Sequence, residues 1–336
     1  AITKEIILRK KEIPKDVKSL YIGGGTPSLL SSQELNNIFT SLKRVIELET
    51  LKEITVEINP EDIDKEKLDN FRTLGINRLS IGVQSLDNVV LKWMNRIHNK
   101  QQILDGLKLI KEYSFEDFNI DFIYGTPSFL KRNYNEEISN LLEYSPPHLS
   151  CYHLTIEQGT YFGHLEKKNK LKNIDDLQSE KEFMWLSKEL KSKGYDHYEI
   201  SNFSLAGKHS FHNSNYWKQL PYIGFGPGAH SLLQRKRRWN ISNNGQYIKN
   251  IALNKTYFQV EILTNNDYIN EAIMLGLRTK NGFNLETILN NTSSKNKAKI
   301  IQKIKELVNK KLIIQKQDYI KMQQGKWLLT EYVSRE

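Results

Sequence analysis

The 336-residue sequence predicts an α/β fold in which short parallel strands alternate with helices. Short runs rich in β-branched and aromatic residues predict six strands, at Ser19–Ile22, Glu53–Ile58, Arg78–Val83, Phe118–Tyr124, His148–Ile156 and Tyr195–Ile200. Helical periodicity lies between them, in Ser31–Ile46, Lys65–Leu74, Gln101–Lys111, Glu136–Glu143 and Asp175–Lys191. Strand–helix units that repeat in this way give parallel strands joined by right-handed crossovers.

Polar residues at the strand ends favour a barrel over an open doubly wound sheet, although the alternation fits both. Gly23–Thr26, Glu57, Gln84 and Thr155 lie at or just past the carboxyl ends of strands, and Asp121 lies within one. In a (β/α) barrel that end is the mouth where ligands bind. Pairing with a Lys or Arg could explain each carboxylate alone, because an unpartnered charge in a core is costly. Five polar features on one rim indicate a shared site.

The stretch Leu20–Pro27 contains three consecutive glycines after a strand. Glycine has no Cβ, so its backbone amides can approach a polar ligand and adopt positive φ without strain. The run therefore reads either as an ordinary tight turn or as a backbone cradle for a small polar group.

The rest of the chain differs in character. Ser204–Ser231 is rich in Gly, His and aromatic residues with little periodicity, which predicts functional loops. Beyond it we expect a small α+β, winged-helix-like appendix, with helices at Asn266–Leu277 and Lys295–Lys310 and a hairpin within Leu312–Leu329. The expected domains are 1–205, 206–260 and 261–336.

Composition indicates a globular protein of a reducing compartment. The chain is 38 % hydrophobic and 26 % charged, and its one cysteine, Cys151, excludes a disulfide within the chain. No signal peptide and no apolar run long enough to span a bilayer is visible, so we expect the cytoplasm. The net charge of +10 raises nucleic-acid binding as an alternative, but lysines spread along the whole sequence fit solvated surfaces better.

Four motifs in order identify a family resemblance. YIGGGTP at Tyr21–Pro27, VEINPE at Val56–Glu61, NRLSIGVQS at Asn77–Ser85 and NIDFIYG at Asn119–Gly125 resemble radical S-adenosylmethionine (radical SAM) proteins of the oxygen-independent coproporphyrinogen III oxidase group. The resemblance extends over essentially the whole chain, and it implies a partial (β/α)₆ TIM-like barrel.

The resemblance also implies a binding site for S-adenosylmethionine. Gly24, Gly25 and Thr26 would present backbone and hydroxyl groups to the amino-acid end of the cofactor. Glu57 would hold a ribose diol or an ammonium group, and Gln84, Arg96 and Asp121 match further contacts. Arg96, in Met94-Asn95-Arg96, could pair with a carboxylate through its planar guanidinium, or be an ordinary surface arginine.

A second signature resembles one branch of the group, the HemW-type haem chaperones. His212-Asn213-Ser214-Asn215-Tyr216-Trp217 fits the pattern HNxxYW, and Tyr222–Ser231 (YIGFGPGAHS) follows it. Imidazole can ligate iron, and aromatic rings can cover a porphyrin. The resemblance makes His212, Asn213, Tyr216 and Trp217 candidate haem contacts. Alternatively, these residues have a structural role and only keep the loop ordered. His209 and His230 are further candidates that are more commonly structural.

The three closely spaced cysteines that hold the family's [4Fe–4S] cluster are absent from this sequence. Iron–sulfur clusters need thiolate ligands, and Cys151 alone lies in an apolar strand. We therefore expect no metal site in this chain, a cluster in the full-length protein only, and a first residue, Ala1, that follows the cluster segment. The 336 residues alone should neither bind the cluster nor cleave S-adenosylmethionine.

Three functions follow from these observations. The first is a haem chaperone that delivers haem to acceptor haemoproteins, which could be membrane-associated, with a homodimer as a possible state. The second is an oxygen-independent coproporphyrinogen III oxidase of porphyrin biosynthesis, which needs the cluster segment. The third is nucleic-acid binding, which rests on the net charge of +10 and on the lysine-rich C-terminal appendix.

Overall fold

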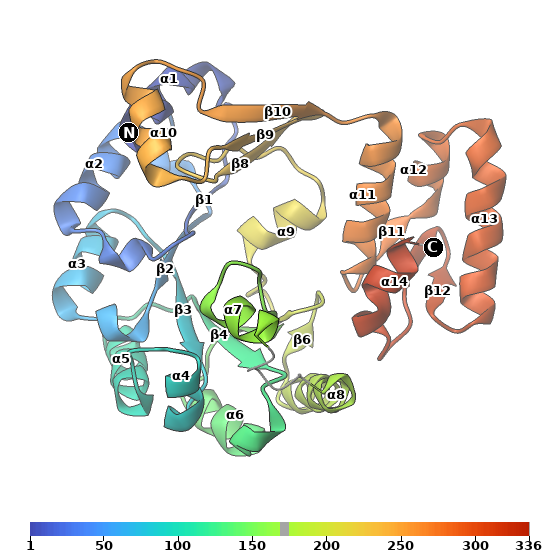
Figure 1. Cartoon of the computed structure of the whole chain (residues 1–336), viewed down its shortest axis with the longest axis horizontal. Coiled ribbons are helices and arrows are strands. Elements are labelled where there is room, and N and C mark those ends of the chain that lie inside the picture. Colours follow the sequence, from blue (N-terminus) through green and yellow to red (C-terminus); the bar gives the residue numbers. More distant parts are fainter. Residues whose placement is uncertain (169–174, 336) are drawn as a thin grey trace. The chain divides into compact units, whose positions relative to one another are not determined.

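The computed structural model describes residues 1–168 and 175–335. They divide into two compact units, and Figure 1 labels their helices and strands along the chain. The first unit comprises Ala1–Leu20, Ser31–Glu53 and the chain from Ser210 onward, and the second comprises Tyr21–Leu30 and Ile54–His209. Each unit is described by itself below.

A seven-stranded sheet with the order β1-β2-β3-β4-β5-β7-β6 forms the centre of the fold. Strands β2 to β5 pair in parallel, as the alternation of strands and helices predicts. The sheet has two edges, β1 and β6, so the barrel is partial rather than closed. The strands are β1 (Ser19–Ile22), β2 (Glu53–Ile58), β3 (Arg78–Gln84), β4 (Phe118–Tyr124), β5 (His148–His153), β6 (Asp196–His197) and β7 (Asn202–Ser204).

The sixth predicted strand, Tyr195–Ile200, is wrong in length and in its neighbour. Only β6 is extended there, and β7 lies between it and β5, antiparallel to both. The chain reverses just after β6, where the Asn202 N–H donates to the Glu199 carbonyl at 3.3 Å. The chain then returns along β5. There the Ser201 carbonyl accepts from the Cys151 N–H, and the Leu205 N–H donates to the Pro147 carbonyl. A reversal this tight leaves too few residues for a long sixth strand.

Four helices of the second unit lie at the positions expected from periodicity, whereas the helices Asn88–Trp93 and Tyr161–Lys167 were not predicted. Capping explains where one of them begins: the Asn99 side chain accepts from the Gln102 N–H, while the Gln102 side chain accepts from the Asn99 N–H. The helices are η2 (Pro27–Leu29), η4 (Pro60–Asp62), α3 (Lys65–Thr73), α4 (Asn88–Trp93), α5 (Lys100–Glu112), η5 (Ser128–Leu130), α6 (Tyr134–Leu142), α7 (Tyr161–Lys167) and α8 (Asp176–Ser192).

The strands of this sheet have one apolar and one polar face, although both faces are largely buried. Val56, Ile81 and Phe122 are on the apolar face, and each is fully buried. The alternate positions carry Glu57, Ser80 and Asp121. Buried parallel strands are usually apolar on both faces. A buried polar face is therefore a feature that needs a function.

The first unit begins with two helices and continues after Ser210 with a helix and an antiparallel sheet. Its elements are α1 (Ile2–Leu8), η1 (Lys10–Glu12), α2 (Ser32–Lys43), η3 (Leu48–Thr50), α9 (Phe211–Trp217), β8 (His230–Leu233), β9 (Lys236–Asn240), α10 (Asn244–Ala252) and β10 (Phe258–Ile262), with strand order β10-β9-β8. The prediction of loops throughout Ser204–Ser231 is wrong at α9, because a helix of two turns is too short to show apolar periodicity.

Glu5 of α1 is buried and organises this part of the unit. Its carboxylate accepts from the Gly226 N–H at 2.8 Å, from the Tyr247 hydroxyl at 2.6 Å and from the Asn240 amide at 2.8 Å. Arg9 pairs with Glu5 at 3.1 Å and donates to the Gly224 carbonyl. The GFGPGAHS segment is thus fixed by a buried ion pair of the first helix.

The C-terminal part has its own apolar core around Leu277, Ile304, Ile313 and Ile320. The predicted α+β appendix is confirmed, with strand order β11-β13-β12. The predicted hairpin is confirmed for β12 and β13, and the chain then enters a short helix. The elements are α11 (Asn265–Leu277), β11 (Phe283–Asn284), α12 (Leu285–Asn290), α13 (Ser294–Asn309), β12 (Ile313–Lys316), β13 (Tyr319–Met322), η6 (Trp327–Leu329) and α14 (Thr330–Arg335).

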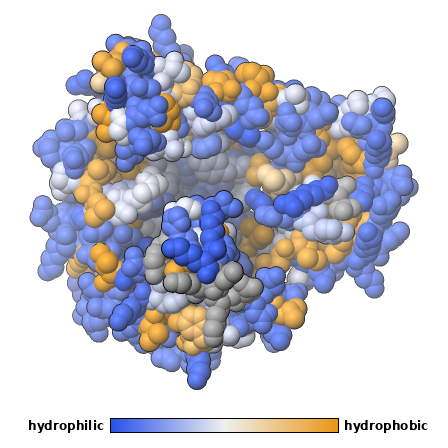
Figure 2. All heavy atoms as spheres, in the orientation of Figure 1, coloured by the Kyte–Doolittle hydropathy of each residue, from blue (hydrophilic) through white to orange (hydrophobic). Residues whose placement is uncertain are grey.

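Hydrophilic residues predominate on the face drawn in Figure 2, and hydrophobic ones are scattered among them. Within the described ranges, no helix is both long and apolar enough to cross a membrane.

Candidate functional site

The glycine loop and Glu57 form one hydrogen-bonded group in the second unit. The Glu57 carboxylate accepts from the Tyr21 hydroxyl at 2.8 Å and from the Gly24 N–H at 3.1 Å. Gly24 and Gly25 have φ of +78° and +84°, and a Cβ added to either would meet nothing within 4 Å. Two exposed glycines in left-handed conformation therefore face open space beside a fixed carboxylate.

Gly23 is needed for a different reason, since its backbone approaches the side chains of the site. A Cβ there would lie 2.5 Å from Glu57 Oε1 and 2.5 Å from the Tyr21 ring. The Tyr21 pKa is raised by burial and by the nearby carboxylates of Glu57 and Asp121, so this hydroxyl stays protonated and donates.

Asp121 lies deeper on the same polar face, and Asn119 and Ser80 hold its carboxylate. The Asn119 amide donates to Asp121 Oδ1 at 2.7 Å, and the Ser80 hydroxyl is 3.4 Å from Oδ2. Burial raises the pKa of Asp121 to about 6, and the charge of Glu57 acts in the same direction. Hydrogen bonds from Asn119 oppose this shift. Asp121 thus titrates near pH 6, well above an ordinary aspartate, and such shifted carboxylates are typical of binding sites.

A buried chain of hydrogen bonds supports Asn119 from below. Its amide oxygen can only accept, so the His148 Nδ1, at 2.6 Å, carries the proton. His148 Nε2 then accepts from the Tyr198 hydroxyl at 2.7 Å. Burial holds the pKa of His148 well below its usual range, in agreement with a neutral imidazole. The relay from Tyr198 to Asp121 is fully satisfied and gives the carboxylate one orientation.

Gln84 ends β3 with a φ of +66°, which is unusual for a residue other than glycine. Arg132 stabilises this conformation by donating to the Gln84 carbonyl at 3.1 Å. The same guanidinium pairs with Glu137 at 2.6 Å, and Glu137 accepts from the Ser85 hydroxyl and the Leu86 N–H. A buried ion pair therefore fixes the segment that carries Gln84.

Not all the residues predicted for this site are brought together. Neighbouring strands and the glycine loop unite Gly24, Glu57 and Asp121 through the contacts described above. Arg96 lies on the exposed segment between α4 and α5. Thr155 is exposed beyond β5, where its hydroxyl is 3.4 Å from the His153 carbonyl.

The residues present fit S-adenosylmethionine but not an iron–sulfur cluster. The open Gly24–Gly25 backbone beside the carboxylates of Glu57 and Asp121 suits a small ligand with ammonium and hydroxyl groups. For the cluster, Cys151 is the chain's one thiol; it is buried, and burial raises its pKa far above the usual range. In the part of the chain that the structure describes, no group of three His, Cys, Asp or Glu side chains could hold a metal ion.

The second candidate site is α9 in the first unit. His212 Nδ1 is 3.0 Å from the Ser19 hydroxyl, and Nε2 is 3.1 Å from the Tyr216 hydroxyl. The Tyr216 ring meets Tyr222 edge to face at 4.8 Å. Burial of the phenol raises the pKa of Tyr216 to about 12, although 39 % of the residue is exposed. Trp217 is half-buried, and its buried indole N–H has no hydrogen-bond partner among the residues that the structure describes.

Glu53, from the start of β2, holds the first turn of α9. Its carboxylate accepts from the N–H groups of Phe211 at 2.8 Å and His212 at 3.0 Å. Ser210 caps the same turn by accepting from the Asn213 N–H at 3.1 Å. Lys52 lies 5.4 Å from the centre of the Phe211 ring. Residues far apart in sequence thus define where the HNxxYW helix begins.

The two other candidate histidines have structural contacts. His209 stacks on Tyr198 with 4.1 Å between ring centres and lies 3.4 Å from Asp196. His230 stacks on Trp239 at the start of β8. Neither contact places them with the residues of α9.

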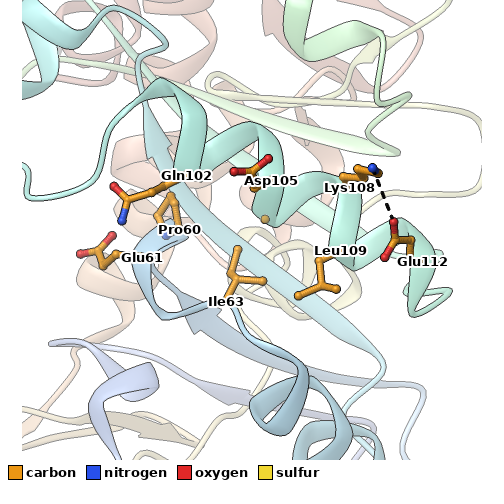
Figure 3. Close-up of a pocket in the computed structure, with 9 residues that line it drawn as sticks. Pro60, Glu61, Ile63, Gln102, Asp105, Lys108, Leu109 and Glu112 are labelled. Atoms are coloured by element: carbon orange, nitrogen blue, oxygen red, sulfur yellow. Dashed lines mark ion pairs between the residues drawn. The ribbon is translucent and has the colours of Figure 1, made fainter.

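A groove on the outside of the second unit, drawn in Figure 3, is separate from the predicted site residues. It runs between η4 and α5, where a Cβ on Gly106 would come within 2.9 Å of Ile63. Lys108 and Glu112 form an ion pair along its rim. The absent side chain of Gly106 lets the two elements pack closely, so this groove results from packing.

Sequence reasoning missed the residues that orient the predicted ones. Strict alternation of polar residues would have revealed Asn119 and His148, since both follow the two-residue period of the polar face. Tyr21 lies two residues before Gly23 and could have been found by the same period. No sequence signal connects Ser19 or Glu53 with α9, because those contacts depend on the tertiary fold.

Comparisons with known proteins agree with the fold and with the motifs. Residues 2–138 match the Radical SAM superfamily, and residues 263–328 match the HemN C-terminal domain. The Escherichia coli coproporphyrinogen III oxidase HemN, a radical SAM enzyme, has a solved structure that aligns with a TM-score of 0.84 at 20 % identity, over 99 % of this chain and 81 % of that one. This likeness confirms the predicted fold.

The sequence relatives show to which branch of the radical SAM group this chain belongs. The heme chaperone HemW of Lactococcus lactis subsp. lactis (strain IL1403) is 34 % identical over 311 residues, which cover 93 % of this chain and 82 % of the relative. The heme chaperone HemW of Bacillus subtilis (strain 168) is 33 % identical over 269 residues, or 80 % of this chain and 71 % of the relative. The chain therefore belongs to the HemW family of radical SAM proteins.

Proposed function

We propose that this chain binds haem and delivers it to haem-dependent acceptor proteins. Family membership carries the proposal, because relatives that align along most of this chain are named heme chaperones. The HNxxYW helix supports it, because α9 places an imidazole, a phenol and an indole on consecutive turns. The coproporphyrinogen oxidase alternative has the likeness of fold to HemN in its favour, and that likeness extends to the fold alone.

The surroundings of α9 suit a flat apolar ligand with acidic edges. Tyr216 and Leu220 are 39 % and 44 % exposed, so two large apolar side chains are open to solvent on the helix and in the turn that follows it. The buried indole N–H of Trp217 has no partner in the described part of the chain and would be satisfied by an oxygen acceptor such as a propionate. Aromatic faces gain dispersion energy against a porphyrin plane.

The polar face of the sheet would hold S-adenosylmethionine. Gly24, Gly25 and Thr26 would meet the amino-acid end, and Glu57 a hydroxyl or ammonium group, with Gln84, Arg96 and Asp121 as further contacts. When bound next to a cluster, this cofactor supplies a radical. The residues of this chain orient it: Tyr21 and Gly24 fix the Glu57 carboxylate, and Asn119 fixes Asp121.

Haem titration followed by transfer tests the proposal. We expect saturable binding of one ferric haem per chain, and a Trp217→Ala variant that binds it more weakly. Asn309→Ala, an exposed change at the end of α13, is the control. Absence of saturable binding would refute haem binding by these residues.

Delivery is distinguished from passive release by its kinetics. The haem-loaded chain is mixed with increasing apomyoglobin, and the transfer rate is followed by absorption. A rate that rises with acceptor concentration indicates direct transfer, whereas a constant rate indicates that haem first dissociates. Size-exclusion chromatography of the same samples tests the homodimer named above as a possible state, and vesicles of anionic lipid test for acceptor delivery at a membrane.

A further inference from the structure

We propose that the iron of bound haem is ligated by the phenolate oxygen of Tyr216, and that His212 is a positioning residue which receives the phenol proton. This inference rests on the proposed haem binding and names the ligand atom within that site. It differs from the simplest interpretation of the HNxxYW pattern, in which the imidazole of His212 would ligate the iron.

Both ring nitrogens of His212 are already engaged within the first unit. Nδ1 is 3.0 Å from the Ser19 hydroxyl and Nε2 is 3.1 Å from the Tyr216 hydroxyl. An imidazole ligates iron through a nitrogen lone pair. For His212 to ligate, one of these two contacts must break, and the Nε2 contact lies on the exposed side of the pair.

Tyr216 is better placed to meet a ligand. It lies one turn after His212 on α9, is 39 % exposed, and has an exposed leucine, Leu220, one turn further along the chain. Its ring is held by the edge-to-face contact with Tyr222. Glu53 and Ser210 fix the first turn of the helix, so the hydroxyl has a defined direction.

The chemistry balances without a further reactant. Tyrosinate is an established class of haem ligand, and ferric iron prefers an anionic oxygen. On ligation the O–H bond of Tyr216 breaks and a bond from iron to oxygen forms. The proton passes to His212 Nε2, already within hydrogen-bond distance, while iron remains ferric. The Nδ1 proton is donated to Ser19, which keeps the imidazole aligned.

The hydrogen bond between Tyr216 and His212 makes ligation by the phenolate reversible. An iron–oxygen bond that forms only when ferric iron and a proton acceptor are both present can also be broken again. Return of the proton from His212 would release the iron, as delivery requires.

Resonance Raman and electron paramagnetic resonance spectra of the ferric haem complex test the assignment. The chain is loaded with ferric haem, and the iron–phenolate vibrations and the high-spin signal are recorded. We expect both in the wild-type chain, their loss in Tyr216→Phe, and at least a tenfold weaker affinity in that variant. Tyr332→Phe, which removes an exposed phenol on α14, is the matched control and should retain them.

Variants of His212 separate positioning from ligation. His212→Gln and His212→Leu both remove the base that receives the phenol proton, so each should weaken the phenolate signature at neutral pH without producing a spectrum typical of imidazole ligation. Circular dichroism checks that each variant is folded. A wild-type spectrum typical of imidazole ligation that persists in Tyr216→Phe and disappears in both His212 variants would overturn the assignment. A phenolate signature that survives in Tyr216→Phe and is lost in Tyr222→Phe would also overturn it. If the wild type bound no haem at all, the proposed function itself would be refuted.

Discussion

The polar face of the seven-stranded sheet and the helix α9 hold their functional side chains in place in different ways. On the sheet, side chains from adjacent strands meet at fixed spacing, and the buried relay through Asn119 and His148 holds Asp121. On α9, the functional groups lie on successive turns of one short helix, and Glu53 holds its first turn. The sheet site depends on strand register, while the helix site depends on a contact from another part of the chain.

This difference predicts how each site fails. A change in the sheet relay leaves several buried polar groups without partners, which destabilises the folded state directly. A change at Glu53 releases only the amides of one helical turn, so its effect should stay local. The four predictions below test that contrast, beginning with the largest effect.

Asn119→Ala should lower the free energy of unfolding by about 4 kcal/mol, because up to four hydrogen-bonding partners lose it at once. Those partners are Ser80, Asp121, His148 and Ser150. Urea denaturation followed by circular dichroism measures the change. The exposed Asn309→Ala should stay within about 0.5 kcal/mol of the wild type. If the two variants were equally stable, the hydrogen bonds of Asn119 would not contribute to the stability of the fold.

Asp121 should make stability depend on pH in an unusual direction. Its folded pKa of about 6 lies above the ordinary 3.8, so the folded chain holds more protons between about pH 4 and 6. The contribution of Asp121 is therefore most favourable below pH 4 and is lost as the pH rises through 6, by about 3 kcal/mol. Asp121→Asn keeps the shape of the protonated acid and should remove this loss.

The measurement compares denaturation midpoints of wild type and Asp121→Asn at intervals from pH 4 to pH 7. The variant should gain relative stability as the pH rises. Asp105→Asn, a change on an exposed face of α5, is the matched control. A difference that does not vary across this range would contradict the buried position assigned to Asp121.

The sheet was predictable from sequence to the extent that its pattern is local. Five of the six expected strands are present because their apolar residues follow one another closely, and Glu57 and Asp121 stand out as carboxylates within such runs. β7 was missed because three residues carry no recognisable period. Tyr21 and Asn119 were missed because each acts by orienting a neighbour, which a list of chemically reactive residues does not include.

The helix site was predictable only in its motif. HNxxYW identified the residues of α9, but the sequence indicated a loop there, and nothing near residue 212 points to Ser19 or Glu53. These contacts join parts of the chain more than 150 residues apart, so they follow from the fold and not from any local pattern.

Glu53→Ala should destabilise α9 by about 2 kcal/mol, since two N–H groups of its first turn lose a charged acceptor. Hydrogen exchange at Phe211 and His212 should become about 30-fold faster, with little change along β3 and β4. Glu53→Gln retains an acceptor and should show a smaller effect. The exposed Glu49→Ala is the control. Faster exchange across the whole sheet would show that Glu53 stabilises the fold rather than α9.

The smallest effect is expected at Gly24, where the contrast with Gly23 isolates backbone strain from crowding. Gly24→Ala places a Cβ in open space, so its cost is that of a φ of +78°, about 1 kcal/mol. In Gly23→Ala the added carbon would come within 2.5 Å of both Glu57 and Tyr21, so those side chains must move and the cost should be larger. Urea denaturation ranks the two variants. If Gly24→Ala proved the more damaging, the glycine loop would be packed against something, and it could not be the open backbone beside Glu57 on which the proposed cofactor site depends.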